Sequence, residues 1–213
     1  MKKLLSILLT VLTVLAIVPI GISAEEMISF MSPQGAVFTT EYSTEEYQLV
    51  KTEDDHKYVY AIYDVSGFVE SWEFDKETPI QTRADAYSNM RYTNRKSVGA
   101  FSGQLVHEVV LWTSRTGSFY QYESLSYDHF SIEGWSYYSL GNYSSAVNPQ
   151  NGKWPTMKVN VSYTCSVIAT ISLNLEASIG GELLEADFSF SGSAGGDITY
   201  TKNIINSYSI ALP

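Results

Sequence analysis

Apolar and polar residues alternate almost without interruption between Met157 and Ile179. The odd-numbered positions are apolar, and the even-numbered positions are polar except for Ile168. Because successive side chains of a β-strand point to opposite faces, this period of two predicts one long strand with an apolar face and a hydroxyl-rich face.

A second alternating segment follows in the opposite phase, from Leu184 to Ala194, after the pair Gly180-Gly181. A two-residue turn at these glycines would place apolar residues opposite apolar residues, for example Leu173 opposite Phe188. The pattern therefore predicts a β-hairpin that turns at Gly180-Gly181.

The segment Gly195-Gly196-Asp197 carries a further turn signal and precedes a β-prone run from Ile198 to Thr201. A three-residue loop there would set Ala194 opposite Ile198. Together with the hairpin, this predicts a C-terminal, Gly-Gly-linked meander of three or four antiparallel strands.

Most other periodic segments also predict strands. They are 57–63, 68–74, 104–113 and 119–127, with turns at 64–67 and 114–118. The segment 43–50 resembles a capped helix, and 148–152 is the best candidate for a connection between two sheets. The expected fold is a single all-β domain over residues 25–213, an antiparallel β-sandwich.

The first 24 residues have the pattern of a secretory signal peptide. Lys2 and Lys3 precede an apolar run from Leu4 to Ile20, and small residues up to Ala24 form the expected cleavage site. The chain is therefore expected to be exported, and to be extracellular after cleavage.

The chain is acidic, with 13 Lys and Arg, 23 Asp and Glu, and a formal net charge of −10. A nucleic acid is not expected as a partner, because phosphate binding requires clustered cations. The acids are concentrated between Glu25 and Glu77, where the bases are Lys51, Lys57 and Lys76 alone. This asymmetry could guide a contact or simply keep the protein soluble.

Catalytic and metal-binding motifs are nearly absent from the sequence. Cys165 is the single cysteine and lies on the apolar phase of its strand, which favours a buried thiol. His107 is expected to be structural, and no cofactor is expected. Acids that could converge on a glycoside substrate are Glu108, Glu123, Asp128 and Glu133. The run Glu53-Asp54-Asp55 could ligate calcium, although a solvated turn fits it better.

Aromatic residues in the middle of the chain suggest sugar stacking, as in carbohydrate-binding sandwiches, or ordinary packing. The candidate stacking residues are Trp112, Trp135, Tyr137, Tyr138 and Trp154.

The predicted glycine hairpin also has the length and pattern of a membrane-spanning β-pair. Residues 167–177 and 184–194 are each 11 long, apolar on one face and largely Ser, Thr or Asn on the other. In this respect the hairpin resembles the insertion hairpins of secreted β-pore-forming toxins, with its turn at Gly180-Gly181. An ordinary sandwich hairpin gives the same alternation.

The sequence as a whole predicts an extracellular binding protein without catalysis, whose partner is a protein or a glycan. The alternatives are a pore-forming or membrane-damaging protein, for which the membrane is the partner, and a carbohydrate-binding module.

Overall fold

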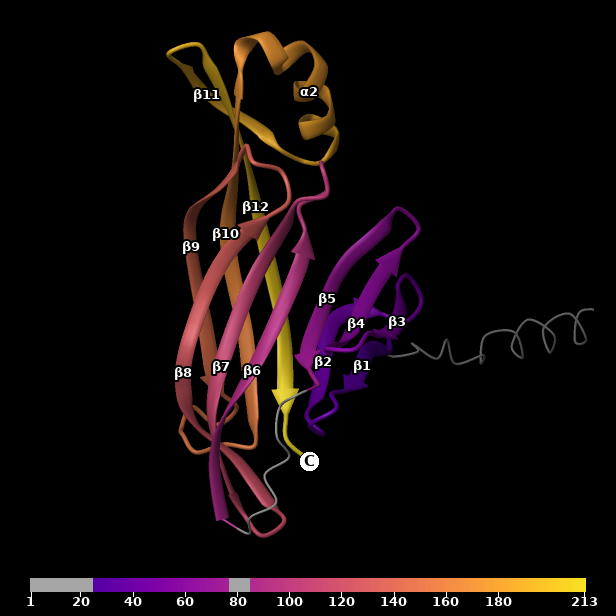
Figure 1. The fold of residues 1–213 in the computed structure, drawn as a ribbon, viewed down its shortest axis with the longest axis vertical. Coiled ribbons are helices and arrows are strands. Elements are labelled where there is room, and N and C mark those ends of the chain that lie inside the picture. Colours follow the sequence, from indigo (N-terminus) through magenta and orange to yellow (C-terminus); the bar gives the residue numbers. More distant parts are fainter. Residues whose placement is uncertain (1–24, 77–84) are drawn as a thin grey trace, which may run out of the picture.

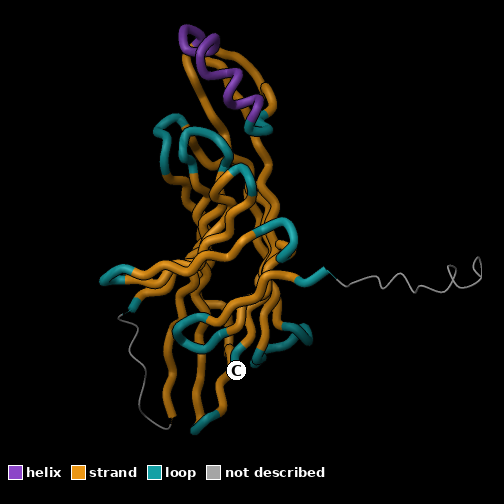
Figure 2. Tube along the Cα trace, turned by 90° about the vertical axis from the view of Figure 1, so that its right-hand side faces the viewer, coloured by secondary structure: helices purple, strands orange, loops and turns teal. Residues whose placement is uncertain are grey.

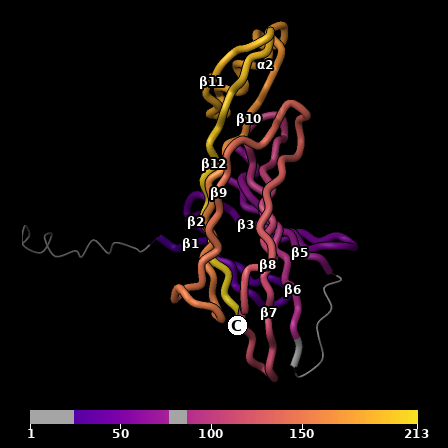
Figure 3. Tube along the Cα trace, turned by 90° about the vertical axis from the view of Figure 1, so that its left-hand side faces the viewer, coloured from indigo at the N-terminus to yellow at the C-terminus, as the bar shows by residue number. Residues whose placement is uncertain are grey.

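The computed structural model describes residues 25–76 and 85–213 and contains two antiparallel sheets of six strands each. The predicted signal peptide lies outside the described residues. In the view of Figure 1 the sheets lie one in front of the other, and the side views in Figures 2 and 3 show an elongated molecule with a helix at one end. The predicted all-β fold with two sheets is confirmed.

The first sheet, sheet A, has the order β1-β2-β12-β10-β9, and β11 also pairs with β12. Its strands are β1 (Met27–Met31), β2 (Val37–Ser43), β9 (Tyr138–Pro149), β10 (Lys158–Ser172), β11 (Ser189–Ala194) and β12 (Asp197–Ala211).

The second sheet, sheet B, follows the chain in the order β3-β4-β5-β6-β7-β8. Its strands are β3 (Gln48–Glu53), β4 (Lys57–Asp64), β5 (Gly67–Asp75), β6 (Asp85–Ser97), β7 (Gln104–Thr116) and β8 (Phe119–Glu133). The predicted strands at 57–63, 68–74, 104–113 and 119–127 all lie within this sheet.

The core lies between the sheets, and β10 shows how the sequence builds it. Its odd-numbered residues from Val159 to Ile171 are all buried, and Cys165 among them is fully buried, as predicted. Burial raises the pKa of the Cys165 thiol to about 11, so the thiol is protonated at neutral pH.

The predicted hairpin at Gly180-Gly181 is wrong, because residues Leu173–Glu185 form the helix α2. β10 pairs with β12 along one edge up to Ser172 and with β9 along the other up to Ala169, so residues 167–169 have no free edge for the segment 184–194. After Ser172 the chain leaves β10, and a helix satisfies its own backbone groups without a partner strand.

The end of α2 is fixed by a Schellman motif. Phe188 N–H donates to the carbonyl of Leu183 at 2.9 Å, and Asp187 N–H donates to that of Leu184 at 3.2 Å. Asp187 has a φ of 63°, the left-handed conformation that this motif requires. Leu183 and Phe188 are both buried in the core, which anchors the helix end to the sheets.

The meander is also corrected in its strand order, which is β10-β12-β11. The turn at Gly195-Gly196 does form, but it contains two residues, so Ala194 lies opposite Asp197 and Ile198 lies opposite Ser193. The predicted register is therefore displaced by one residue on one side of the turn.

Two other local predictions are wrong. Residues 43–50 form the end of β2, a turn and the start of β3 instead of a helix. The segment 148–152 joins β9 to β10 within sheet A, whereas the connections between the sheets are at 44–47 and 134–137. The turn at Asp64–Gly67 forms as predicted, with Asp64 Oδ1 accepting from the N–H groups of Ser66 and Gly67.

Candidate functional site

The structure places the five predicted stacking aromatics in three separate places. Trp112 lies on β7, with its side chain on the outer face of sheet B. Trp135, Tyr137 and Tyr138 lie at the connection between β8 and β9, where Tyr138 is buried. Trp154 is half-buried in the connection between β9 and β10, so the five do not form one surface.

The outer face of sheet B carries a row of exposed rings around Trp112. Tyr87 of β6 stacks against Trp112, with ring centroids 5.8 Å apart and planes 13° apart. Further along the same face, Tyr127 and His129 of β8 stack at 5.7 Å. We call these four residues the aromatic strip; Tyr87 is 63%, Trp112 36% and Tyr127 47% exposed.

The strand register brings the aromatic strip together. Trp112 of β7 lies opposite Asn89, two residues along β6 from Tyr87, and Val110 lies opposite Tyr127. Because side chains two apart share a face, Val110 and Trp112 point to the same outer side. In Figure 1 no other element lies in front of β6, β7 and β8, so this face is open to solvent.

Polar groups flank the aromatic strip on the same strands. Arg91 Nη1 lies 3.4 Å from Glu108 Oε2, and the Arg91 side chain is 60% exposed. Ser126 Oγ donates to Asn89 Oδ1 at 3.1 Å. The face therefore combines exposed rings with hydrogen-bonding groups of both polarities.

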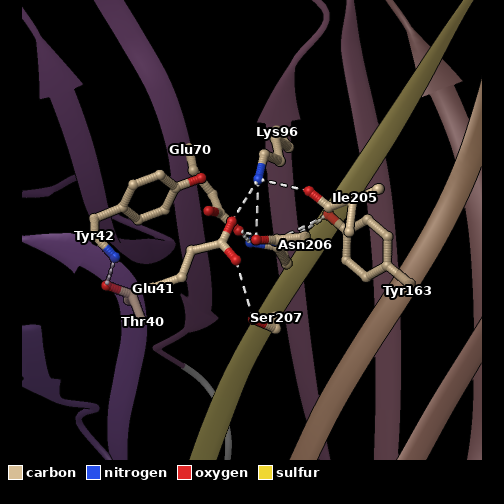
Figure 4. Close-up of polar contacts among 10 residues, drawn as sticks. Thr40, Glu41, Tyr42, Glu70, Lys96, Tyr163, Ile205, Asn206 and Ser207 are labelled. Carbon is tan, nitrogen blue, oxygen red and sulfur yellow. Dashed lines mark hydrogen bonds and ion pairs between the residues drawn. The ribbon is translucent and has the colours of Figure 1, made fainter.

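The interior contains a polar network centred on Glu70, shown in Figure 4. One carboxylate oxygen of this fully buried residue accepts from the side-chain amides of Asn94 and Asn206. Tyr163 donates to Asn94 Oδ1 at 2.9 Å, and Lys96 Nζ donates to Asn206 Oδ1 at 3.0 Å. These residues come from both sheets, so the network ties the sheets together.

Burying a charged carboxylate in this network costs free energy. Burial raises the pKa of Glu70, and the positive charge of Lys96 and the hydrogen bonds oppose that rise. Lys96 itself lies 3.1 Å from Glu41 Oε1 at the rim of the network. The network faces inward, which distinguishes it from the exposed aromatic strip.

His107 is fully buried, in agreement with a structural role. Its ring stacks on Phe130 at 4.3 Å, and its Nε2 lies 2.7 Å from Asp128 Oδ1. Burial disfavours the charged form of Asp128, but the hydrogen bond and charge of His107 outweigh it and lower the pKa of this carboxyl.

The four acids considered for glycoside chemistry each have their own partners. Glu108 pairs with Arg91, Glu123 accepts from Ser114 and Gln121, Asp128 faces His107 and Glu133 pairs with Arg95. In the calcium candidate, Asp54 Oδ1 accepts from the N–H groups of His56 and Lys57, which lowers the pKa of Asp54 and closes the turn between β3 and β4.

Within residues 25–76 and 85–213, no group of three His, Cys, Asp or Glu side chains is arranged to hold a metal ion. Over the same ranges, no helix has the length and apolar character needed to cross a membrane.

Sequence reasoning identified Trp112 but missed Tyr87, Tyr127 and His129 as its neighbours. Tyr127 ends the predicted strand at 119–127, and its position on the outward-facing side of that strand was the signal that could have identified it. Tyr87 was not found because β6 has no strict alternation from Asp85 to Ser97. No protein-family model, curated protein or solved structure is significantly similar to this chain.

Proposed function

We propose that this chain is an exported, non-catalytic binding protein that recognises a glycan through the aromatic strip on the outer face of sheet B. The observation that carries the proposal is the exposure of Tyr87, Trp112 and Tyr127 on one uncovered sheet face. Large exposed rings cost free energy in water, and their gathering on one face is typical of a binding surface.

A glycan fits the chemistry of this face. The C–H groups of a sugar ring contact aromatic rings, while its hydroxyl groups need hydrogen-bond donors and acceptors beside those rings. Asn89, Arg91 and Glu108 supply such groups next to the rings. The net charge of −10 favours a neutral glycan over a polyanion.

The rigid position of the face also supports binding. Residues 85–97 of β6 pair with residues 104–116 of β7 without a register shift, so Tyr87 and Trp112 are fixed relative to one another before a ligand arrives. A preformed surface loses little conformational entropy on binding.

The pore-forming alternative is less supported than glycan binding, because the hairpin that it requires is not formed in this structure. Residues 167–172 are paired with β12, and residues 189–194 are paired with the other edge of β12. An insertion hairpin would require both segments to leave β12 and pair with each other.

The proposal is tested by replacing Trp112 with Ala in the exported chain and screening neutral glycans. Loss of a central stacking ring should weaken binding by at least about tenfold. Isothermal titration with the best glycan of the screen provides the measurement, and quenching of Trp fluorescence in the parent protein provides a second one.

The matched control is Tyr143→Ala, because Tyr143 is also exposed, at 55%, but lies on β9 of sheet A. It should bind the glycan like the parent. Equal binding by Trp112→Ala and the parent, or a screen in which no glycan binds, would reject the proposal.

A further inference from the structure

A second surface lies beside the edge strands β1 of sheet A and β3 of sheet B. The aromatic strip lies on β6, β7 and β8, at the other end of sheet B. The second surface is a groove of about 1020 Å³ between the start of β1, the turn that joins β2 to β3, and the turn between β4 and β5. A binding role for this groove is independent of the proposed glycan-binding function.

One wall of the groove is β1, an edge strand of sheet A. Glu26 O accepts from Thr44 N–H, and Ile28 O accepts from Thr40 Oγ1, so the even-numbered residues direct their backbone groups to β2. In an extended strand the alternate residues direct theirs to the other side. The N–H and C=O groups of Met27, Ser29 and Met31 therefore face the edge that no described strand occupies.

β1 has no charged residue or proline to guard its edge against pairing. Edge strands are commonly guarded by Lys, Pro or inward charges, whereas β1 has the sequence MISFM, without charge or proline. Met27 is 42% exposed beside the groove. β1 is therefore available to pair with an added strand.

The charges of the groove define the partner. Glu26, Glu45, Glu46 and Asp64 line it, and none of its lining residues is Lys or Arg. Asp64 also closes the turn to Gly67 through its carboxylate. The exposed side chains of Met27 and Val65 add apolar surface for the carbon chains of Lys or Arg.

We propose that this groove binds a cationic peptide segment in extended conformation, which adds a strand to the open edge of β1. The backbone of the segment would pair with Ser29 and Met31, and its Lys or Arg side chains would contact the carboxylates of the groove. A second copy of this chain is a poor occupant, because it would bring the same negative charges to the same place.

The first experiment titrates the exported chain with a short, end-capped peptide of alternating Lys and Thr. The matching Glu and Thr peptide is the charge control, and a Lys and Thr peptide with alternate N-methylated amides is the pairing control. We expect binding of the first peptide alone, with a loss of at least about tenfold for each control. Equal binding of the N-methylated peptide would overturn the proposal, since it cannot add a strand.

Two protein variants locate the site. Ser29→Pro removes an N–H of the open edge, while Ser29→Ala keeps that N–H and loses only the hydroxyl contact with Thr39. We expect Ser29→Pro to bind at least about tenfold more weakly and Ser29→Ala to bind within about twofold of the parent.

A double variant, Glu45→Gln with Glu46→Gln, tests the charge without touching the edge backbone. It should weaken binding and reduce its dependence on salt. Unchanged affinity in this variant, absence of any peptide binding, or peptide-reversible dimerisation in sedimentation velocity would overturn the proposal, the last by showing that the occupant is another copy of this chain.

Discussion

The two glycine pairs of the C-terminal region have the same sequence and opposite structures. Gly180-Gly181 lies in the middle of α2, whereas Gly195-Gly196 forms the turn between β11 and β12. At the second pair, φ is 63° and 92°, in the left-handed region that favours glycine. A glycine pair therefore permits either a helix or a turn, and the strand pairing of the flanking residues decides which one forms.

The difference lies in the partners available to each side. The residues flanking Gly195-Gly196 both reach a strand partner, since Ala194 pairs with Asp197 across the turn. The residues before Gly180 extend beyond the sheets and have no described strand to pair with. A helix forms there despite two glycines, each of which costs about 1 kcal/mol relative to alanine in a helix interior.

The largest effect is expected at the turn. Replacing Gly195 and Gly196 together by Ala forces two side chains into the left-handed region, at a cost of about 2–4 kcal/mol in the free energy of unfolding. Urea denaturation followed by far-UV circular dichroism measures the loss. The double Asn variant is the control and should lose clearly less, because Asn tolerates this conformation; equal losses would contradict the assignment of strain to the turn.

A smaller loss is expected at Gly180, where the helix packs closely against β12. A Cβ at this position would lie 2.7 Å from the hydroxyl oxygen of the buried Tyr200. Overpacking costs about 1–3 kcal/mol and the gain in helix propensity offsets about 1 kcal/mol, so Gly180→Ala should lower the free energy of unfolding by about 1 kcal/mol.

The background variant Tyr200→Phe tests that contact directly, because it removes the hydroxyl oxygen. In this background Gly180→Ala should be neutral or stabilising. A loss of the same size in both backgrounds would show that the contact with Tyr200 is not the cause.

The smallest effect, and one of opposite sign, is expected at Gly181. A Cβ there would have no atom within 4 Å, and the residue is helical, so Gly181→Ala should raise the free energy of unfolding by about 0.5–1 kcal/mol. The same urea titration checks it. A destabilised variant would contradict a helix in this segment and would favour the predicted turn at Gly180-Gly181.

The sequence predicted what depends on local pattern. The alternation identified β10 and its buried face up to Ile171, including Cys165, and the turn at Asp64–Gly67 followed from its residue types. The helix was missed because its residues keep the period of two up to Ile179. The signal for its end was the pair Leu183 and Phe188 with the left-handed residue Asp187, where glycine is commoner.

Strand order and the aromatic strip could not be predicted because both depend on pairing between distant segments. Trp112 was a candidate by residue type alone. Its neighbours Tyr87 and Tyr127 join it through the register of β6, β7 and β8, which no short segment specifies. Trp135 and Trp154 are separated from Trp112 because they lie in the connections between β8 and β9 and between β9 and β10.

The position of β12 inside sheet A has a consequence for how the chain folds. β12 pairs with β2, β10 and β11, and its residue Tyr208 lies opposite Thr40. During synthesis, the ribosome must therefore release the chain beyond β12 (Asp197–Ala211) before sheet A can close around this strand. Contacts of such long sequence separation also fold slowly, so the nascent chain exposes the edges of β2 and β10 for longer than a protein built from neighbouring hairpins.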